Sequence, residues 1–298
     1  MTPRALFVGL ATLDLIYRAE RPPAANEKIV AERQLVAAGG PAANAAATFS
    51  HLGGSATLLA AIGTGVPADA VAAELRSRGV EIHDVARGEP DILPVSSIVV
   101  SSDTGDRAVI SRNAGGHDVK PPGDLTELLS EVDLVEVDGH HPRLSLAVAR
   151  AARERGLPVL LDAGSWKPIT SRLLPFCDLV LASADFRPPG VSSAPDVLDF
   201  LLDAGAGLAA VSRGPAAILW RTGNDGGEVP VATVPIVDTL GAGDVLHGAF
   251  AYAAAADPRE SRFPDALVFA AGVASSSCSV FGTRAWMDGA VHDYVGRG

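Results

Sequence analysis

The sequence is poor in cysteine, in basic residues and in long apolar runs, and each shortage excludes a class of protein. Its two cysteines, Cys177 and Cys278, have no metal-type spacing and are expected to be inert thiols of a reducing compartment. Lysine and arginine number 24 against 35 acidic residues, which gives a net charge of −11 and makes a nucleic-acid partner unexpected. No apolar run reaches ~20 residues, so we expect no transmembrane helix and no membrane partner.

Three further patterns are missing. The chain has no internal repeat and no low-complexity segment. The loop after its first strand-like segment, 9–13, lacks the Gly-x-Gly-x-x-Gly of dinucleotide-binding enzymes, which sets an oxidoreductase aside. No signal peptide is visible, because Met1–Arg4 leads directly into a strand-like segment, and we therefore expect a cytoplasmic protein.

The 298 residues, 48% of them hydrophobic, are enough for a sizeable core. Short apolar segments alternate with helical patterns, which predicts a parallel sheet covered on both faces. Strands are expected at 6–10, 27–36, 56–62, 95–101, 107–111, 133–138, 158–162, 178–182, 208–212, 216–220 and 229–237. Helices are expected at 41–52, 68–78, 143–154, 196–204, 242–256 and 263–277. We treat 1–298 as a single domain.

The most informative stretch is Asp238-Thr239-Leu240-Gly241-Ala242-Gly243-Asp244, where a helix is expected to begin. The first N–H groups of a helix have no intrahelical acceptor, and small side chains allow an anion to approach them. A carboxylate beside such an anion is repulsive unless it accepts a proton from a hydroxyl that attacks a phosphate, and this is the role we assign to Asp244. A lone Asp here would instead complement the helix dipole.

Carboxylates also follow the expected strands of the sheet. Asp14 comes soon after the first strand, and Asp138 and Asp162 end two later strands. Because ligands of open α/β sheets bind outside the carboxyl ends of the strands, these three side chains form a plausible polyol-binding set. His140 is either a substrate contact or a plain loop residue, since adjacent histidines do not easily chelate one metal ion.

Two segments resemble one known family. Residues 238–244 look like the C-terminal signature of the PfkB carbohydrate kinases, and Gly39-Gly40-Pro41-Ala42-Ala43-Asn44-Ala45-Ala46 looks like their N-terminal signature. The resemblance implies the ribokinase-like fold, a three-layer α/β/α sandwich with a mostly parallel central sheet and a small β lid. It also implies ATP-dependent phosphorylation of a sugar, with Asp244 as catalytic base and Gly241, Ala242 and Gly243 as anion hole.

Further site residues follow from the same resemblance. It implies that the lid comprises segments near 12–36 and 94–114, and that two lids pair in a homodimer. The sugar-binding residues that it implies or allows are Asp14, Gly39, Gly40, Asn44, Asp138, His140 and Arg112. The residues that it places beside ATP are Ser212, Gly214, Ala271, Ala274 and Gly282.

The chain departs from the family at one place. Many members carry Asn-x-x-Glu to position magnesium, whereas this chain has Ser183-Ala184-Asp185-Phe186, so Asp185 is the partial substitute for holding Mg²⁺. Asp238 would lie beside a monovalent cation such as K⁺. The ketohexokinase-like and sulfofructose-kinase-like members depart similarly, which favours a ketose. A nucleoside or sugar-phosphate kinase of the same fold, and a non-catalytic sugar or nucleotide sensor, remain as alternatives.

Overall fold

The computed structural model describes residues 2–117, 119–259 and 262–288, and two sheets organise them. The strands of the larger sheet are β1 (Arg4–Val8), β4 (Ser55–Ala60), β5 (Val80–Asp84), β8 (Leu134–Val137), β9 (Val159–Ala163), β10 (Leu179–Ser183), β11 (Leu208–Arg213), β12 (Ala216–Thr222) and β13 (Gly226–Val229). Their spatial order is β13-β12-β11-β10-β9-β8-β1-β4-β5. All neighbours pair in parallel except β11–β12 and β12–β13, which are antiparallel.

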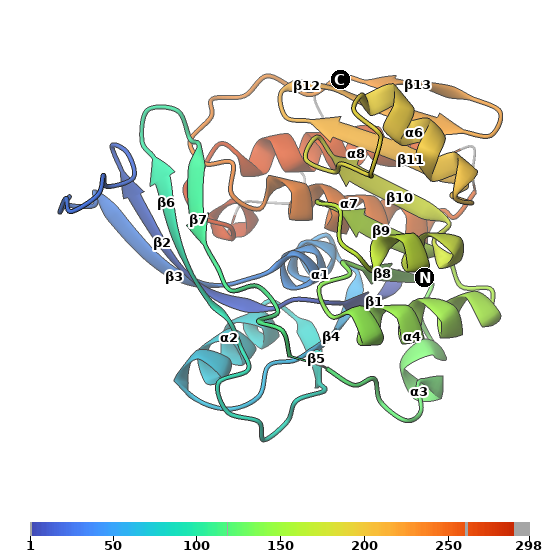
Figure 1. Cartoon of the computed structure of the whole chain (residues 1–298), viewed down its shortest axis with the longest axis horizontal. Coiled ribbons are helices and arrows are strands. Elements are labelled where there is room, and N and C mark those ends of the chain that lie inside the picture. The colour runs from blue at the N-terminus through green and yellow to red at the C-terminus, as the bar shows by residue number, and fades with distance from the viewer. Residues whose placement is uncertain (1, 118, 260–261, 289–298) are drawn as a thin grey trace.

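Helices cover both faces of this sheet, as Figure 1 shows. One face carries α1 (Pro41–His51), α2 (Val66–Ser77), α7 (Ala242–Ala256) and α8 (Phe263–Ser277), which share one apolar core with the strands. The other face carries α4 (Pro142–Glu154), α6 (Ala194–Asp203) and the short α3 (Thr126–Leu129) and α5 (Thr170–Leu173). Short 3-10 helices lie at η1 (Leu174–Phe176) and η3 (Ala285–Asp288). The parallel strands are apolar almost throughout because both of their faces are covered.

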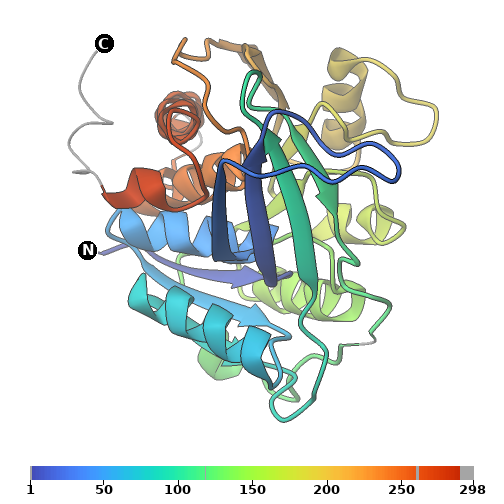
Figure 2. The ribbon, with the colours of Figure 1, turned by 90° about the vertical axis from the view of Figure 1, so that its left-hand side faces the viewer.

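A second sheet of four strands stands to one side of the first (Figures 1 and 2). It consists of β2 (Thr12–Ala19), β3 (Arg33–Gly39), β6 (Val95–Ser101) and β7 (Arg107–Ile110), in the order β3-β2-β6-β7. The β6–β7 hairpin predicted around the 103–106 turn is present, with Val100 opposite Arg107. The strand predicted at 27–36 instead occupies Arg33–Gly39.

Two other expectations were wrong. Asp14 is not in a loop after a strand of the large sheet, because the chain enters β2 at Thr12 and pairs it with both β3 and β6. The strand predicted at 229–237 ends at Val229, and residues 230–236 are neither helix nor strand. Two backbone bonds hold the end of that segment, where the N–H groups of Val237 and Asp238 both donate to the carbonyl of Cys278.

The predicted three-layer α/β/α arrangement with a mostly parallel central sheet is confirmed. In the described part of the chain, no helix is long and apolar enough to cross a membrane. Cys177 is buried, and burial raises the pKa of its thiol to about 12, which makes it unreactive.

Candidate active site

Two helices that lie far apart in the sequence meet at Asp244. The Asn44 side chain of α1 donates from Nδ2 to Asp244 Oδ2 of α7 at 2.6 Å. The helices come this close because Gly248, one turn beyond Asp244, has no side chain. A Cβ on Gly248 would overlap the carbonyl oxygen of Ala45. The alanine-rich α1 and this glycine therefore place an amide against a carboxylate.

The residues of the predicted anion site lie at the start of α7. Gly241 caps the helix in the left-handed region, with φ at 74°, which glycine adopts without strain. A Cβ there would lie 3.4 Å from Thr283 Cγ2 and 3.8 Å from Asp244 Oδ2, so this turn borders the carboxylate. Gly243 is exposed, and an added Cβ would meet nothing within 4 Å. The Ala242 N–H donates to the Thr239 carbonyl at 3.3 Å, whereas the Gly243 N–H has no partner among the described residues and is open to a ligand beside Asp244.

The environment of Asp244 adjusts its acidity. Burial raises the pKa of this carboxyl to about 6, and the negative charge of Asp162 acts in the same direction. The hydrogen bond from Asn44 and the charges of His247 and Arg107 oppose the rise in pKa. A carboxylate of this pKa is ionised at neutral pH and is still basic enough to accept a proton.

Two residues beside this site were not singled out from the sequence. His247 is 5% exposed, with Nδ1 2.7 Å from the Gly243 carbonyl oxygen and Nε2 3.0 Å from that of Leu181. Its spacing of three residues from Asp244 on one helix was the signal that could have found it. Arg284 is 6% exposed and donates to the carbonyl of Ala38, and no sequence pattern pointed to it.

The predicted sugar residues of the N-terminal signature gather at the junction of β2, β3 and α1. A Cβ on Gly39 would overlap the Asp14 carboxylate, and one on Gly40 would overlap the Leu10 carbonyl. Asp14 is 5% exposed and accepts a 2.6 Å bond from Thr12 Oγ1, while burial raises the pKa of its carboxyl. The glycine pair therefore lets two chain segments approach closely at this point.

Asp138 lies at the end of β8 as predicted, but its carboxylate is engaged within the protein. One oxygen accepts from the Leu10 N–H at 2.7 Å and the other from the His140 N–H at 2.9 Å. Asp138 is only 1% exposed. This geometry fixes the loop after β1 against the loop after β8, and the contact of Asp138 with sugar hydroxyls stays a prediction.

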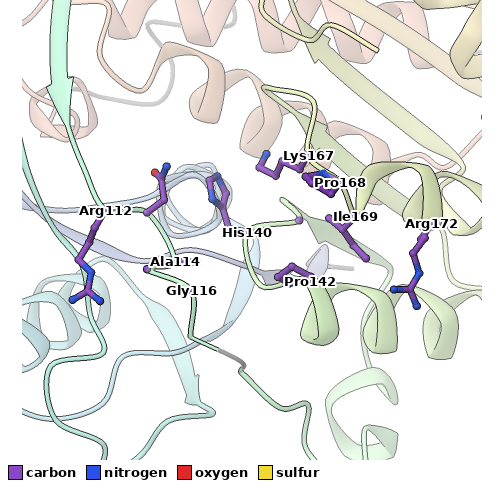
Figure 3. Close-up of a pocket in the computed structure, with 12 residues that line it drawn as sticks. Arg112, Ala114, Gly116, His140, Pro142, Lys167, Pro168, Ile169 and Arg172 are labelled. Carbon is purple, nitrogen blue, oxygen red and sulfur yellow. The ribbon is translucent and has the colours of Figure 1, made fainter. Parts of the chain in front are cut away.

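A cavity of about 530 Å³ opens beside these loops (Figure 3). The loops that follow β7, β8 and β9 form it, and its lining includes the predicted substrate residues Arg112 and His140. Arg112 is exposed and lies 3.2 Å from His117 through Nη2 and Nε2. Burial lowers the pKa of His140, and the positive charge of Lys167 acts in the same direction, while the negative charges of Asp138 and Asp162 oppose the decrease.

The predicted nucleotide residues lie at the end of β11, in the turn after it, on α8 and in the loop after α8. Ser212 is the second-last residue of β11, and Gly214 forms the turn before β12 with φ at 59°. Ala274 is half-buried on α8, and Gly282 follows that helix with φ at 96°. Ala271 differs from expectation because it is 4% exposed and packs in the apolar core, so its methyl group offers little surface to a base.

The predicted metal residues do not form a cluster. Within residues 2–117, 119–259 and 262–288, no group of three or more His, Cys, Asp or Glu side chains could hold an ion. Asp185 is exposed after β10. Asp238 accepts backbone N–H bonds from Leu240 and Gly282, each at 2.9 Å, one on each oxygen. Its carboxylate therefore joins two loops, and the reaction proposed below does not depend on a monovalent cation.

Comparison with known proteins gives a consistent result. The model of the pfkB family of carbohydrate kinases matches residues 2–288. A ribokinase of Lactococcus lactis subsp. lactis is 24% identical over 249 residues, which cover 82% of this chain and 81% of the relative. An ATP-dependent ribose-1-phosphate kinase of Halopiger xanaduensis is 29% identical over 260 residues, 83% of each chain. The solved structure of Arabidopsis thaliana ribokinase with ribose and ATP has a similar fold, with a TM-score of 0.79, 23% identity and coverage of 95% and 94%.

Proposed function

The chain belongs to the pfkB family of carbohydrate kinases, and on that premise we propose that it transfers the γ-phosphoryl group of ATP to a sugar hydroxyl with Asp244 as the catalytic base. The observation that carries the proposal is the position of Asp244. Its carboxylate lies at the start of α7, beside Gly241, and is held at 2.6 Å by Asn44.

The chemistry follows from that arrangement. The hydroxyl oxygen of the sugar forms a bond to the γ-phosphorus as its proton passes to Asp244, and the bond between the γ-phosphorus and the bridging oxygen breaks to release ADP. The amides of Gly241, Ala242 and Gly243 stabilise the charge that grows on the transferred group. Ionisation of Asp244 at neutral pH supplies the base, because its pKa is about 6.

Two buried polar atoms support a sugar site next to this base. In the described part of the chain, Asn44 Oδ1 and Thr283 Oγ1 are buried without a hydrogen-bond partner. Both residues lie around Gly241. A buried polar atom without a partner is costly, and sugar hydroxyls would satisfy both atoms. Asp14 would accept hydroxyls on the lid side of the same site.

The preference for a ketose over an aldose stays a proposal. It comes from the departure at 183–186, which the ketohexokinase-like and sulfofructose-kinase-like members share, and from the resemblance of residues 9–14 and 274–278 to that branch. The two curated relatives reported above carry ribose in their names, so they do not favour it.

The nucleotide would lie along Ser212, Gly214, Ala274 and Gly282. Mg²⁺ in kinases is held mainly by phosphate oxygens and waters, with one or two protein carboxylates. The exposed carboxylate of Asp185 would fit as one protein ligand of a Mg²⁺ ion that binds together with ATP. When bound, Mg²⁺ would neutralise charge on the phosphates.

We also propose that two copies of the chain associate through the four-stranded sheet, which would act as the lid. Its edge strands β3 and β7 expose Val36, Val109 and Ile110, at 48%, 49% and 78%. Unpaired edges that carry apolar side chains favour pairing with another chain. Light scattering at micromolar concentration tests this proposal, and a monomeric mass would contradict it.

ATP consumption across a panel of ketoses, aldoses, nucleosides and sugar phosphates tests the proposed function. The proposal expects ADP formation with at least one sugar and one phosphorylated product for each ADP. If every sugar that binds leaves ATP intact, the chain is a ligand sensor rather than a kinase.

A further inference from the structure

The cavity in Figure 3 has an unusual charge for this chain. The protein carries a net charge of −11, yet the charged side chains in the cavity lining, Arg112, Lys167 and Arg172, are all basic. The remaining lining includes His140 and Asn113 and contains no Asp or Glu. In a chain with more acidic than basic residues, a cavity lined in this way favours an anionic ligand.

The cations of this cavity are also not neutralised by the protein. Arginines elsewhere on the surface, such as Arg4, Arg21 and Arg221, form ion pairs with carboxylates. Among the described residues, Lys167, Arg172 and Arg112 form no ion pair. The side chain of Arg112 forms a hydrogen bond with His117 and lies against Gly115. These charges are therefore available to a ligand.

Lys167 is positioned by its backbone and its stem. The Lys167 N–H donates to Thr170 Oγ1 at 3.2 Å, and the Thr170 N–H donates back to the Lys167 carbonyl at 2.9 Å. Its aliphatic stem passes close to Gly139, where an added Cβ would lie 3.7 Å from Lys167 Cδ. Figure 3 shows Lys167 reaching toward His140, while Arg112 and Arg172 lie at opposite ends of the cavity. Lys167 is thus the central cation.

The cavity lies on the sugar side of the proposed reaction. It is formed after β7, β8 and β9, whereas the residues proposed for ATP follow β11 and α8. In the strand order, β10 separates these two groups of loops. Asp162 connects the cavity to the base, because its charge acts on the pKa of both His140 and Asp244.

We propose that the cavity binds an acidic substituent, a phosphate or a carboxylate, of the acceptor sugar, with Lys167 as the residue that determines this specificity. The proposal rests on the proposed kinase function and names its substrate class, a sugar that is already anionic. Arg112 and Arg172 add long-range attraction at the two ends, and His140 donates or accepts one hydrogen bond as a neutral imidazole.

The test compares matched sugars in the whole protein with MgATP: ribose with ribose 1-phosphate, fructose with fructose 6-phosphate, and galactose with galacturonate. We expect at least one acidic sugar to exceed its neutral partner in kcat/KM by about tenfold or more. Lys167→Met should lower that ratio by about 10- to 100-fold, the range for a hydrogen bond to a charged group. Lys120→Met, which removes an exposed lysine outside the cavity, should leave the ratio unchanged.

Two results would overturn the proposal. One is equal turnover of neutral and acidic sugars by the unmodified protein. The other is a Lys167→Met variant that loses activity equally on both members of a pair and has a raised KM for ATP, because the cavity would then serve the transferred phosphoryl group.

Calorimetry without ATP separates this proposal from the kinase function. Ribose 1-phosphate, fructose 6-phosphate and galacturonate are titrated into the unmodified protein and into the Lys167→Met variant at two salt concentrations. Binding that weakens with salt and with Lys167→Met supports the subsite even if no sugar is turned over. Turnover of neutral sugars together with no binding of any acidic sugar keeps the kinase function and removes the subsite.

Discussion

The amide of Asn44 donates to the carboxylate of Asp244 at 2.6 Å and joins α1 to α7. This bond fixes the direction of the carboxylate and stabilises its charged form. Asn44 Oδ1 is buried and has no partner among the described residues. One side chain can therefore orient the base through its nitrogen and bind the acceptor through its oxygen.

The pH dependence of the reaction follows from the pKa of Asp244. The proposed base must be ionised, and its pKa is about 6, so kcat/KM should fall as the pH decreases through about 6. Stopped or coupled assays between about pH 5 and 8 measure this limb. A profile that stays flat down to about pH 5 would contradict the assignment.

Replacement of the groups that lower the pKa of Asp244 should move that limb to higher pH. Asn44→Leu removes the hydrogen bond, and Arg107→Gln removes a positive charge that has a smaller effect on the pKa of Asp244. We therefore expect the Asn44 variant to shift the limb further than the Arg107 variant. Ser50→Ala on the same helix, whose hydroxyl bonds to the Arg78 carbonyl, is the control and should not shift it.

The two glycines of the anion site should respond differently to alanine. Gly241→Ala places a side chain at a φ of 74°, so it should destabilise the fold by about 1–2 kcal/mol. Gly243→Ala has no such strain and meets no protein atom within 4 Å, so it should not destabilise the fold. Its methyl group should still lower turnover by obstructing the phosphoryl group. Thermal unfolding and kcat together test this pair, and full turnover of Gly243→Ala would place the anion elsewhere.

The buried carboxyl of Glu136 allows a prediction about the pH dependence of stability that does not depend on catalysis. It is fully buried on β8, and neither of its oxygens has a partner in the described part of the chain. Burial raises its pKa well above the usual value, and the charges of Asp162 and Asp138 add to this. The folded protein therefore keeps a proton that the unfolded chain loses near about pH 4.3, and stability falls as the pH rises above that value.

Glu136→Gln should remove this loss of stability. The gain in the unfolding midpoint over the unmodified protein should be larger at about pH 8 than at about pH 5, because the free energy that the unfolded chain gains by ionising this carboxyl grows with each pH unit above its pKa. Differential scanning calorimetry at both pH values measures it. An equal difference at the two pH values would mean that Glu136 is charged in the folded state.

The helices of the site and their functional ends could be predicted from sequence. The bounds predicted for α7 and α8 match the structure, because glycine, Asp-Pro and regular apolar spacing mark helix ends locally. The contact of Asn44 with Asp244 could be expected only through family resemblance, since no local pattern joins residues 200 positions apart.

Other features depend on long-range packing that a local pattern does not encode. Residues 230–236 have strand-like composition, but no strand in the described part of the chain pairs with them. Asp138 resembles a ligand residue because it ends a strand, yet its oxygens accept N–H groups from Leu10 and His140. The side chain of His247 meets carbonyls from α7 and β10, and the second of these contacts requires the folded sheet.

Asp244→Asn tests the account most directly, because it keeps the shape of the side chain and removes its basicity. The account predicts that kcat falls by about 10²- to 10⁴-fold while calorimetry shows ATP and sugar still bound. Asp69→Asn, which changes an exposed first-turn acid of α2, should keep normal turnover. Turnover of Asp244→Asn close to that of the unmodified enzyme would contradict the role of Asp244 as the base.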